Sequence, residues 1–210
     1  MARESGQTKI RGGGRGGGRR SRGTEPRNRA MRTMSQGFAL LTCLVAAQLA
    51  WGQEKVASEN EKAPEFQLKA SDGKEYSLKD FAGKQAVVLA WYPKSFTGGC
   101  RAECLSMRDA GEEIRKFDVA YFTISCDDLE TQKKWAKELM LDYPVLSDPD
   151  TKVARAYGVV HEGRERPERW TFVIDKTGVV KRIDKMVNTK SHGADIVKTL
   201  ESLGVAKKAK

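Results

Sequence analysis

The sequence predicts an α/β fold in which a central mixed β-sheet is flanked by helices, and three observations carry this prediction. The apolar run Ala86–Trp91 is too short for a helix and is typical of a buried strand. Residues 100–117 are amphipathic at helical spacing, and a second apolar run follows at residues 119–125. Strand, helix and strand in this order indicate a βαβ unit, whose right-handed crossover places helices on the faces of the sheet.

The remaining elements complete one domain, predicted over residues 63–205. Residues 65–69 and 76–78 alternate around a Ser-Asp-Gly-Lys turn and predict an N-terminal β-hairpin. The elements expected after the βαβ unit are a helix from 127 to 139, a strand at 143–146, a helix from 150 to 157, strands at 170–174 and 179–183, and a last helix at about 194–203. A βαβ unit, then a hairpin and a final helix, is the order of a thioredoxin-like fold.

The net charge of the chain is concentrated near its N-terminus. The 210 residues carry a formal charge of +10, yet the first 52 hold ten Lys or Arg and two Asp or Glu. The other 158 residues hold 28 and 26, so the domain is near neutral and is not expected to bind nucleic acid. Four cysteines in a chain of this length do not indicate a disulfide scaffold.

Residues 1–30 form a basic extension rich in Arg and Gly, which cannot bury apolar surface and is expected to be disordered. An RNA-binding tail is one alternative for this extension. The other is that it is not translated, with the start of translation at Met31 or Met34.

Residues 31–52 have the features of a secretory signal peptide: a basic flank, a short apolar run, and Ala50-Trp51-Gly52 as a small-x-small cleavage site. Cleavage before Gln53 would export the protein to the periplasm or the medium, without stable membrane association, and would leave residues 53–62 as a linker. An uncleaved anchor helix is the alternative, although the apolar run is short for a bilayer span.

The stretch from Tyr92 to Cys104, with the sequence YPKSFTGGCRAEC, joins the first buried strand to the amphipathic helix. Cys100 lies in the first turn of that helix, where unpaired N–H groups and the positive end of the helix dipole favour a negative charge. A thiol in such a place loses its proton more readily than a free cysteine. The sequence therefore indicates a nucleophilic thiolate at Cys100.

Residues 63–184 resemble a peroxiredoxin of the bacterioferritin-comigratory-protein, or Q, type. Pro93, Thr97 and Cys100 meet the family pattern P-x-x-x-T/S-x-x-C, and Glu103 occupies a position typical of that type. The later blocks that match are LSDPD from residue 146, AYGV from residue 156 and RWTFVID from residue 169. The chain departs from the family in having Thr-Gly-Gly-Cys for Thr-Pro-Gly-Cys, and in having Leu105 where a resolving cysteine commonly stands.

The resemblance implies a thiol-dependent peroxidase that reduces hydrogen peroxide and organic hydroperoxides through a sulfenic acid on Cys100. Thr97 would bind the thiolate and the peroxide, Pro93 would shield the sulfur from water, and Arg169 would stabilise the developing charge. A thioredoxin-like protein or a small thiol would be the reductant, without cofactor or metal, and the protein would be a monomer or a weak dimer. The residues alone leave plainer roles open: Thr97 could cap the helix, Pro93 could end the strand, and Glu103 could interact with the helix dipole.

The thiol that resolves the sulfenic acid is not fixed by the sequence. Cys104 is the first choice because it lies one helical turn from Cys100, within disulfide reach if the turn unwinds. Cys126, at the end of the second buried strand, and an external thiol are the alternatives.

Two other classes share the predicted fold. A Sco-type copper-binding chaperone would use Cys100, Cys104 and His161, because soft thiolates and an imidazole suit copper. Such a site leaves Pro93 and Arg169 without a role. A disulfide reductase normally has C-x-x-C, whereas three residues separate the two cysteines here.

Overall fold

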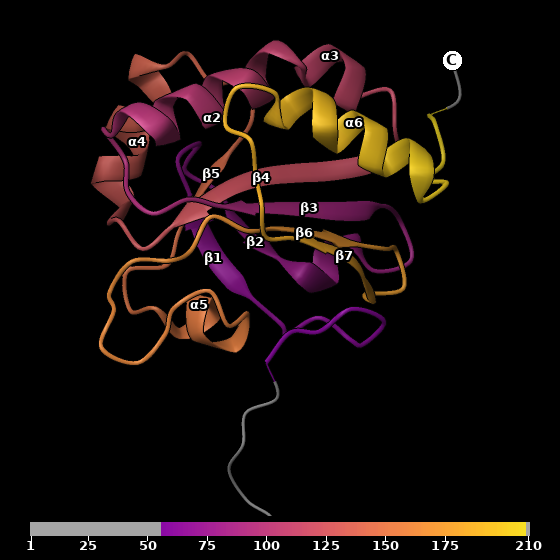
Figure 1. Ribbon diagram of the computed structural model, residues 1–210, viewed down its shortest axis with the longest axis horizontal. Coiled ribbons are helices and arrows are strands. Elements are labelled where there is room, and N and C mark those ends of the chain that lie inside the picture. The colour runs from indigo at the N-terminus through magenta and orange to yellow at the C-terminus, as the bar shows by residue number, and fades with distance from the viewer. Residues whose placement is uncertain (1–55, 209–210) are drawn as a thin grey trace, which may run out of the picture. The chain divides into compact units, whose positions relative to one another are not determined.

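The structure is a computed structural model that describes residues 56–208. Its centre is a seven-stranded mixed sheet with the strand order β2-β1-β5-β4-β3-β6-β7 (Figure 1). The strands are β1 (Gln67–Ala70), β2 (Glu75–Ser77), β3 (Ala86–Trp91), β4 (Val119–Ser125), β5 (Val145–Ser147), β6 (Thr171–Ile174) and β7 (Val180–Asp184). The helices are the short 3-10 helix η1 (Leu78–Phe81), α2 (Gly98–Asp109), α3 (Gly111–Ile114), α4 (Leu129–Glu138), α5 (Lys152–Ala156) and α6 (His192–Ser202).

The sheet is parallel at its centre and antiparallel on both sides. β4 pairs in parallel with β3 and with β5. β1 pairs antiparallel with β2 and β5, while β6 pairs antiparallel with β3 and β7. Parallel strands must be joined by crossovers, and α2 with α3 provides the one between β3 and β4. The predicted mixed sheet of the thioredoxin-like fold is confirmed.

Both faces of the sheet are covered, which explains why β3 is apolar at every position. All six residues of β3 are buried. Val87 and Leu89 belong to the core cluster that includes α5 residues, whereas Val88 and Ala90 pack with residues of α2, α3 and α6. Figure 1 shows α2, α3 and α6 above the sheet and α5 below it. Alternate side chains of a strand point to opposite faces, so a strand inside two layers needs apolar residues throughout.

Two helices differ from the ranges that the sequence predicts. The amphipathic helix over residues 100–117 is interrupted at Ala110, where α2 ends and α3 begins. Gly111 follows, and a Cβ atom there would lie 2.9 Å from both Arg115 Nη1 and Asp142 Oδ2, so the absence of a side chain lets these groups approach. The last helix, α6, begins at His192 rather than near residue 194, which brings that histidine into the helix and into the protein interior.

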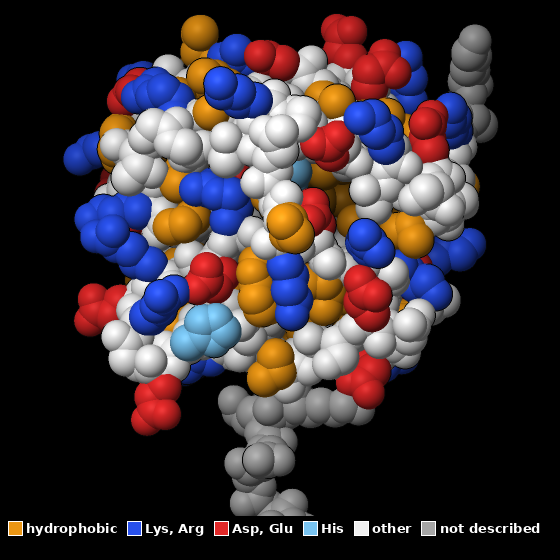
Figure 2. All heavy atoms as spheres, viewed as in Figure 1, with side chains coloured by type: hydrophobic (Ala, Val, Ile, Leu, Met, Phe, Trp, Pro, Cys, Tyr) orange, Lys and Arg blue, Asp and Glu red, His pale blue; other side chains and the backbone are white. Residues whose placement is uncertain are grey.

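The predicted extension and signal peptide, residues 1–52, lie outside the described residues. The described part of the predicted linker lies against the domain: Ala57 is buried, and the Asn60 N–H donates to Val180 O at 2.7 Å. Between residues 56 and 208, no helix is long and apolar enough to cross a membrane. Figure 2 shows Lys and Arg interspersed with Asp and Glu on the visible face, in agreement with the near-neutral charge of the domain.

Candidate active site

The candidate site is built at the C-terminal ends of β3 and β4, which the sheet places side by side. Trp91, the last residue of β3, pairs with Ile124 of β4, and the next N–H, that of Tyr92, donates to Ile124 O at 3.0 Å. β3 leads into α2, and β4 is followed directly by Cys126. The edge of a parallel sheet at which strands lead into helices is the usual location of sites in such folds.

Hydrogen bonds to Gln132 of α4 and to Asp127 hold the loop between β3 and α2 in place. The Tyr92 hydroxyl donates to Gln132 Oε1 at 2.7 Å and lies 2.9 Å from the Ser95 hydroxyl. The Ser95 N–H donates to Asp127 Oδ2 at 2.7 Å. Phe96 has a left-handed φ of 62° and rests on the ring of Trp135, with ring centroids 5.0 Å apart. The loop therefore enters α2 at a fixed angle.

Cys100 is the third residue of α2, and its side chain is almost fully buried, with 1% exposure. The helix N-cap is Thr97, whose side chain makes no capping hydrogen bond. Instead, the Thr97 hydroxyl donates to Lys94 O at 2.9 Å. The N–H groups of the first turn of α2 are consequently not taken by a side-chain cap, and they remain available to an anion at Cys100.

Arg169 bridges the thiol and a buried carboxylate. Its Nη2 atom donates to Cys100 Sγ at 3.3 Å, and its Nη1 atom donates to Glu103 Oε2. The backbone beside it is fixed, because Trp170 O accepts a hydrogen bond from Trp91 N at 2.9 Å. A planar guanidinium with forked donors can hold both partners in one orientation. This cation lies within hydrogen-bond distance of the Cys100 sulfur.

Glu103 is fully buried, which the sequence alone did not indicate. Its second oxygen, Oε1, faces His192 Nδ1 at 3.3 Å, while His192 Nε2 lies 2.8 Å from the Thr171 hydroxyl. The pKa of His192 is lowered to about 4, mainly by burial; Asp184 and Asp195 oppose this shift, and Arg169 contributes to it. His192 is therefore neutral at neutral pH. The sequence carried no sign of this role for His192, because its contact with Glu103 joins residues far apart in the chain.

The start of α6, which carries His192, is locked onto α2. A Cβ atom on Gly193 would lie 2.2 Å from Ser106 O and 2.6 Å from the Ala110 side chain, so the two helices touch at this glycine. The Gly193 N–H donates to Ser106 Oγ at 3.1 Å, and that hydroxyl donates to Lys190 O at 3.2 Å. Ser106 stands three residues after Glu103 on α2. The same contact thus sets the place of His192 relative to Glu103.

The structure places Arg169 against Cys100, and the loop that carries Pro93 and Thr97 leads into the first turn of α2. Pro93 is half-buried just after β3, while Thr97 is exposed at the start of α2. With its proton donated to Lys94 O, the Thr97 hydroxyl keeps oxygen lone pairs that can accept a further hydrogen bond.

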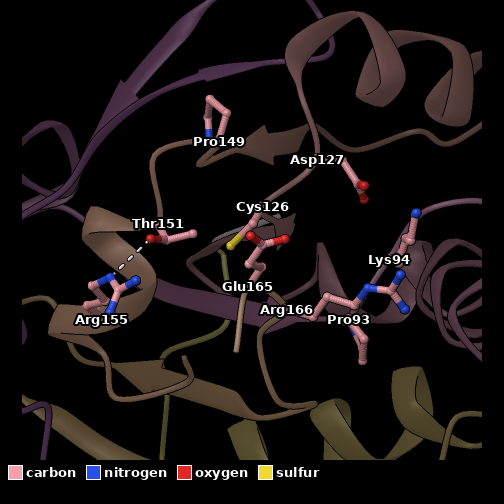
Figure 3. A pocket seen from close by; sticks show the side chains of 9 residues that line it. All are labelled: Pro93, Lys94, Cys126, Asp127, Pro149, Thr151, Arg155, Glu165 and Arg166. Atoms are coloured by element: carbon pink, nitrogen blue, oxygen red, sulfur yellow. Dashed lines mark hydrogen bonds between the residues drawn. The ribbon is translucent and has the colours of Figure 1, made fainter. Parts of the chain in front are cut away.

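Cys104 and Cys126 are free thiols, like Cys100. Cys104 is fully buried between α2 and α4, and burial raises its pKa to about 12. Cys126 is half-buried and lines a cavity of about 520 Å³ together with Pro93, Lys94, Asp127 and Arg155 (Figure 3). Burial raises the pKa of Cys126 to about 12, with further contributions from Asp148 and Asp127. Neither thiol has the arginine contact of Cys100.

The three residues of the copper alternative are not gathered into one site. His161 lies in an exposed segment, 3.8 Å from Glu168 and beside the ring of Trp170. Within the described part of the chain, no group of three or more His, Cys, Asp or Glu side chains is placed to hold a metal ion.

A buried cysteine at the start of a helix, held by an arginine and set in a thioredoxin-like sheet, defines the class of thiol peroxidases. The model of the AhpC/TSA family matches residues 60–183. The chain is 36% identical over 147 residues to chloroplastic peroxiredoxin Q of Gentiana triflora, which covers 69% of this chain and 67% of that protein. It is 34% identical over 149 residues to peroxiredoxin Bcp of Bacillus subtilis strain 168, covering 68% and 94%.

Among solved structures, the chain is similar to peroxidoxin BcpB from Mycobacterium tuberculosis, with a TM-score of 0.64 and 29% identity over 70% of this chain and 98% of that one. The chain therefore belongs to the AhpC/TSA family, in its peroxiredoxin Q or Bcp group. It is a thiol peroxidase, an oxidoreductase, and the predicted family is confirmed.

Proposed function

We propose that Cys100 is the peroxidatic cysteine, and that the chain uses it to reduce hydrogen peroxide and organic hydroperoxides. The observation that carries this proposal is the 3.3 Å contact between Arg169 Nη2 and Cys100 Sγ in the uncapped first turn of α2. The thiolate, not the thiol, is the nucleophile of cysteine chemistry. Of the three described cysteines, Cys100 alone combines a cation with a helix start.

The reaction follows from this arrangement. The Cys100 thiolate attacks one oxygen of ROOH, an S–O bond forms, and the O–O bond breaks. The sulfur is oxidised to a sulfenic acid, the peroxide is reduced, and one proton is taken up to release ROH. Arg169 neutralises the thiolate before attack, and its donors can stabilise the charge that passes to the leaving oxygen. The Thr97 hydroxyl would accept the O–H of the peroxide, while Pro93 would limit access of water.

Gly98 and Gly99 are exposed next to the buried Cys100. A Cβ atom on Gly98 would have no neighbour within 4 Å, and one on Gly99 would meet only Arg169 Nη2, at 3.6 Å. The glycine pair therefore adds no side chain next to Cys100, which supports the proposal that both substrate classes can approach it.

For regeneration we propose a thioredoxin-like protein or a small thiol as the reductant, with Cys104 as the first candidate for the resolving thiol. Cys104 is fully buried, and its carbonyl accepts a hydrogen bond from the Tyr143 hydroxyl at 2.9 Å. A Cys100–Cys104 disulfide would require the first turns of α2 to unwind. Cys126 lines a cavity next to Pro93 and is the alternative inside the chain.

We also propose that the mature protein is exported and begins near Gln53, because residues 31–52 have the pattern of a signal peptide. N-terminal sequencing of the native protein from separated cell fractions tests this. A cytosolic protein that retains residues 31–52 would contradict it.

The function is tested by stopped-flow measurement of peroxide consumption by the full chain with Cys100→Ser, beside Cys126→Ser as the matched control. Cys100→Ser should abolish peroxide reduction without loss of the fold, and Cys126→Ser should react with peroxide at the wild-type rate. Consumption by Cys100→Ser at the wild-type rate would overturn the proposal.

A further inference from the structure

Glu103 and His192 form a buried polar pair behind the candidate active site. Glu103 Oε1 and His192 Nδ1 are both inaccessible to solvent, and neither has a hydrogen-bond partner in the described structure. They face each other at 3.3 Å, without the alignment of a full hydrogen bond. A buried polar atom without a partner is costly, so a pair of such atoms placed face to face calls for an explanation.

The protonation state of the imidazole follows from its partners. Arg169 donates to Glu103, and an ionised carboxylate can only accept hydrogen bonds. His192 Nδ1 must therefore carry the proton that faces Glu103 Oε1. Nε2 is then the unprotonated nitrogen, and it accepts from the Thr171 hydroxyl at 2.8 Å. The Thr171 hydroxyl on β6 can donate to Nε2, and it thus accommodates the tautomer that Glu103 requires.

We propose that His192 is a positioning residue for the peroxidase reaction, which acts through Glu103 and Arg169 on the Cys100 thiolate. The neutral imidazole lies against one carboxylate oxygen at 3.3 Å and limits how the carboxylate can turn, so that the other oxygen keeps the guanidinium turned toward the sulfur. This inference rests on the proposed role of Cys100, and it adds a residue of α6 that touches neither the sulfur nor the site of the peroxide.

Two features of the structure favour positioning over a merely structural role. The contact between Gly193 and Ser106 fixes α6 on α2 independently of the imidazole. The carboxylate of Glu103 contacts both the imidazole of His192 and the guanidinium of Arg169, so the imidazole can act on the guanidinium through this carboxylate. The charged groups around His192 are Glu103 on α2, Arg169 before β6, Asp184 on β7 and Asp195 on α6, so its neighbours include three acids and one cation.

Three substitutions at His192 in the full chain separate the possible roles. In His192→Asn, the side-chain amide nitrogen occupies the place of Nδ1 and can still donate to Glu103. In His192→Gln, the amide occupies the place of Nε2 and can satisfy only Thr171. His192→Leu removes both contacts. His161→Asn is the matched control, because it removes the other histidine of the chain, which is exposed.

Two readouts are measured for each variant: the second-order rate of peroxide reduction, and the pH midpoint of Cys100 alkylation by iodoacetamide, followed on the Cys100 peptide by mass spectrometry. His192→Leu and His192→Gln should lower the peroxide rate roughly tenfold to a hundredfold, the cost of a reacting group displaced by about 1 Å. Their alkylation midpoint should move to higher pH. His192→Asn should stay close to the wild type in both, and His161→Asn should change neither.

If His192 has a purely structural role, its variants should have lower melting temperatures but unchanged peroxide rates and alkylation midpoints. His192→Asn should then also be as destabilised as His192→Leu. Either result overturns the proposal. If His192→Leu fails to fold, the proposal is decided by Thr171→Val and by the difference between His192→Asn and His192→Gln. Proton–nitrogen correlation spectra of the wild-type histidines supply an independent test, and Nε2 protonation of His192 would contradict the assignment. If the wild type itself shows no turnover that depends on Cys100, the proposed function fails, which is a distinct outcome.

Discussion

Cys100 and Cys126 both follow neighbouring parallel strands at one edge of the sheet, yet they have opposite electrostatic surroundings. Cys100 contacts the guanidinium of Arg169. Burial raises the pKa of Cys126 to about 12; the nearby Asp148, Asp127 and Asp150 contribute to the shift, and Arg155 opposes it. Two thiols at one edge of one sheet thus have charges of opposite sign beside them.

The helices next to the two cysteines also differ in how their N-termini are capped. The N-terminus of α4, which follows Cys126, is capped by Asp128, whose carboxylate accepts the Thr131 N–H at 2.8 Å. The N-terminus of α2 has no side-chain cap, because the Thr97 hydroxyl donates to Lys94 O instead. The positive end of α4 is already compensated, whereas that of α2 is left for the thiolate. The fold provides positions for two thiols, and in the proposed function the local donors and charges select Cys100.

The largest effect is expected from Arg169→Gln, which removes the cation from Cys100 and leaves the Glu103 carboxylate buried without it. The rate of peroxide reduction should fall by about 10²–10³, the range found when a donor to a developing anion is removed. Arg155→Gln, which removes a cation near Cys126, should leave the rate unchanged. Stopped-flow kinetics measures the rate of peroxide reduction in both variants. Equal losses of rate would contradict the difference drawn between the two thiols.

A smaller effect is expected at the other thiol. Asp148→Asn removes the largest charge contribution to the raised pKa of Cys126 but leaves burial, which is the main cause, in place. The alkylation rate of Cys126 near pH 8 should increase a few-fold, in line with a shift of a fraction of a unit. Peptide mass spectrometry after timed alkylation measures this. An unchanged rate would show that the aspartate does not act on Cys126.

The pH dependence of stability should also differ in sign between the two regions. The pKa of His192 is lowered to about 4, so its contribution to stability is present above pH 6.5 and is lost as pH falls toward 4. Burial raises the pKa of Asp148 to about 6, so the stability that this group contributes is present below pH 4 and is lost as pH rises toward 6.

Thermal unfolding between pH 4 and 6.5 tests these signs. The melting temperature of Asp148→Asn should rise with pH more steeply than that of the wild type, and that of His192→Asn should rise less or fall. Parallel curves for all three proteins would contradict the assignment.

The smallest effect concerns the departure from the family pattern at Gly98. This residue is the first of α2, its φ is not positive, and a Cβ atom there would meet no neighbour. Proline is favoured at the first position of a helix. Gly98→Pro should stabilise the fold by about 0.4–1 kcal/mol, mainly by restricting the unfolded chain, and should leave the peroxidase rate close to wild type. Chemical denaturation measures the first quantity, and a destabilised variant would show that the loop needs its glycine.

The sequence was informative where the signal is local. The run Ala86–Trp91 predicts β3 because both faces of a central strand are buried, and the position of Cys100 at a strand-loop-helix junction predicts its place at the start of α2. The direction of the Thr97 hydroxyl could not be predicted, since it depends on the turn made by Lys94.

The buried pair of Glu103 and His192 could not be predicted either. It depends on how α6 packs on α2 at Gly193, and periodicity carries no information on a contact between segments so distant in the chain. The sequence suggested a plainer role for Glu103 as an acidic partner of the helix dipole, but α2 begins at Gly98, and Glu103, its sixth residue, lies beyond the first turn.

The central claim, that local charge makes Cys100 rather than Cys126 the reactive thiol, is tested most directly by adding one equivalent of hydrogen peroxide to the reduced full chain. A sulfenic acid trap is present, and the oxidised cysteines are then mapped by peptide mass spectrometry. Every oxidised species should contain Cys100, as the trapped sulfenic acid or as a disulfide with a resolving cysteine. Oxidation of Cys126 while Cys100 remains a free thiol would contradict the account.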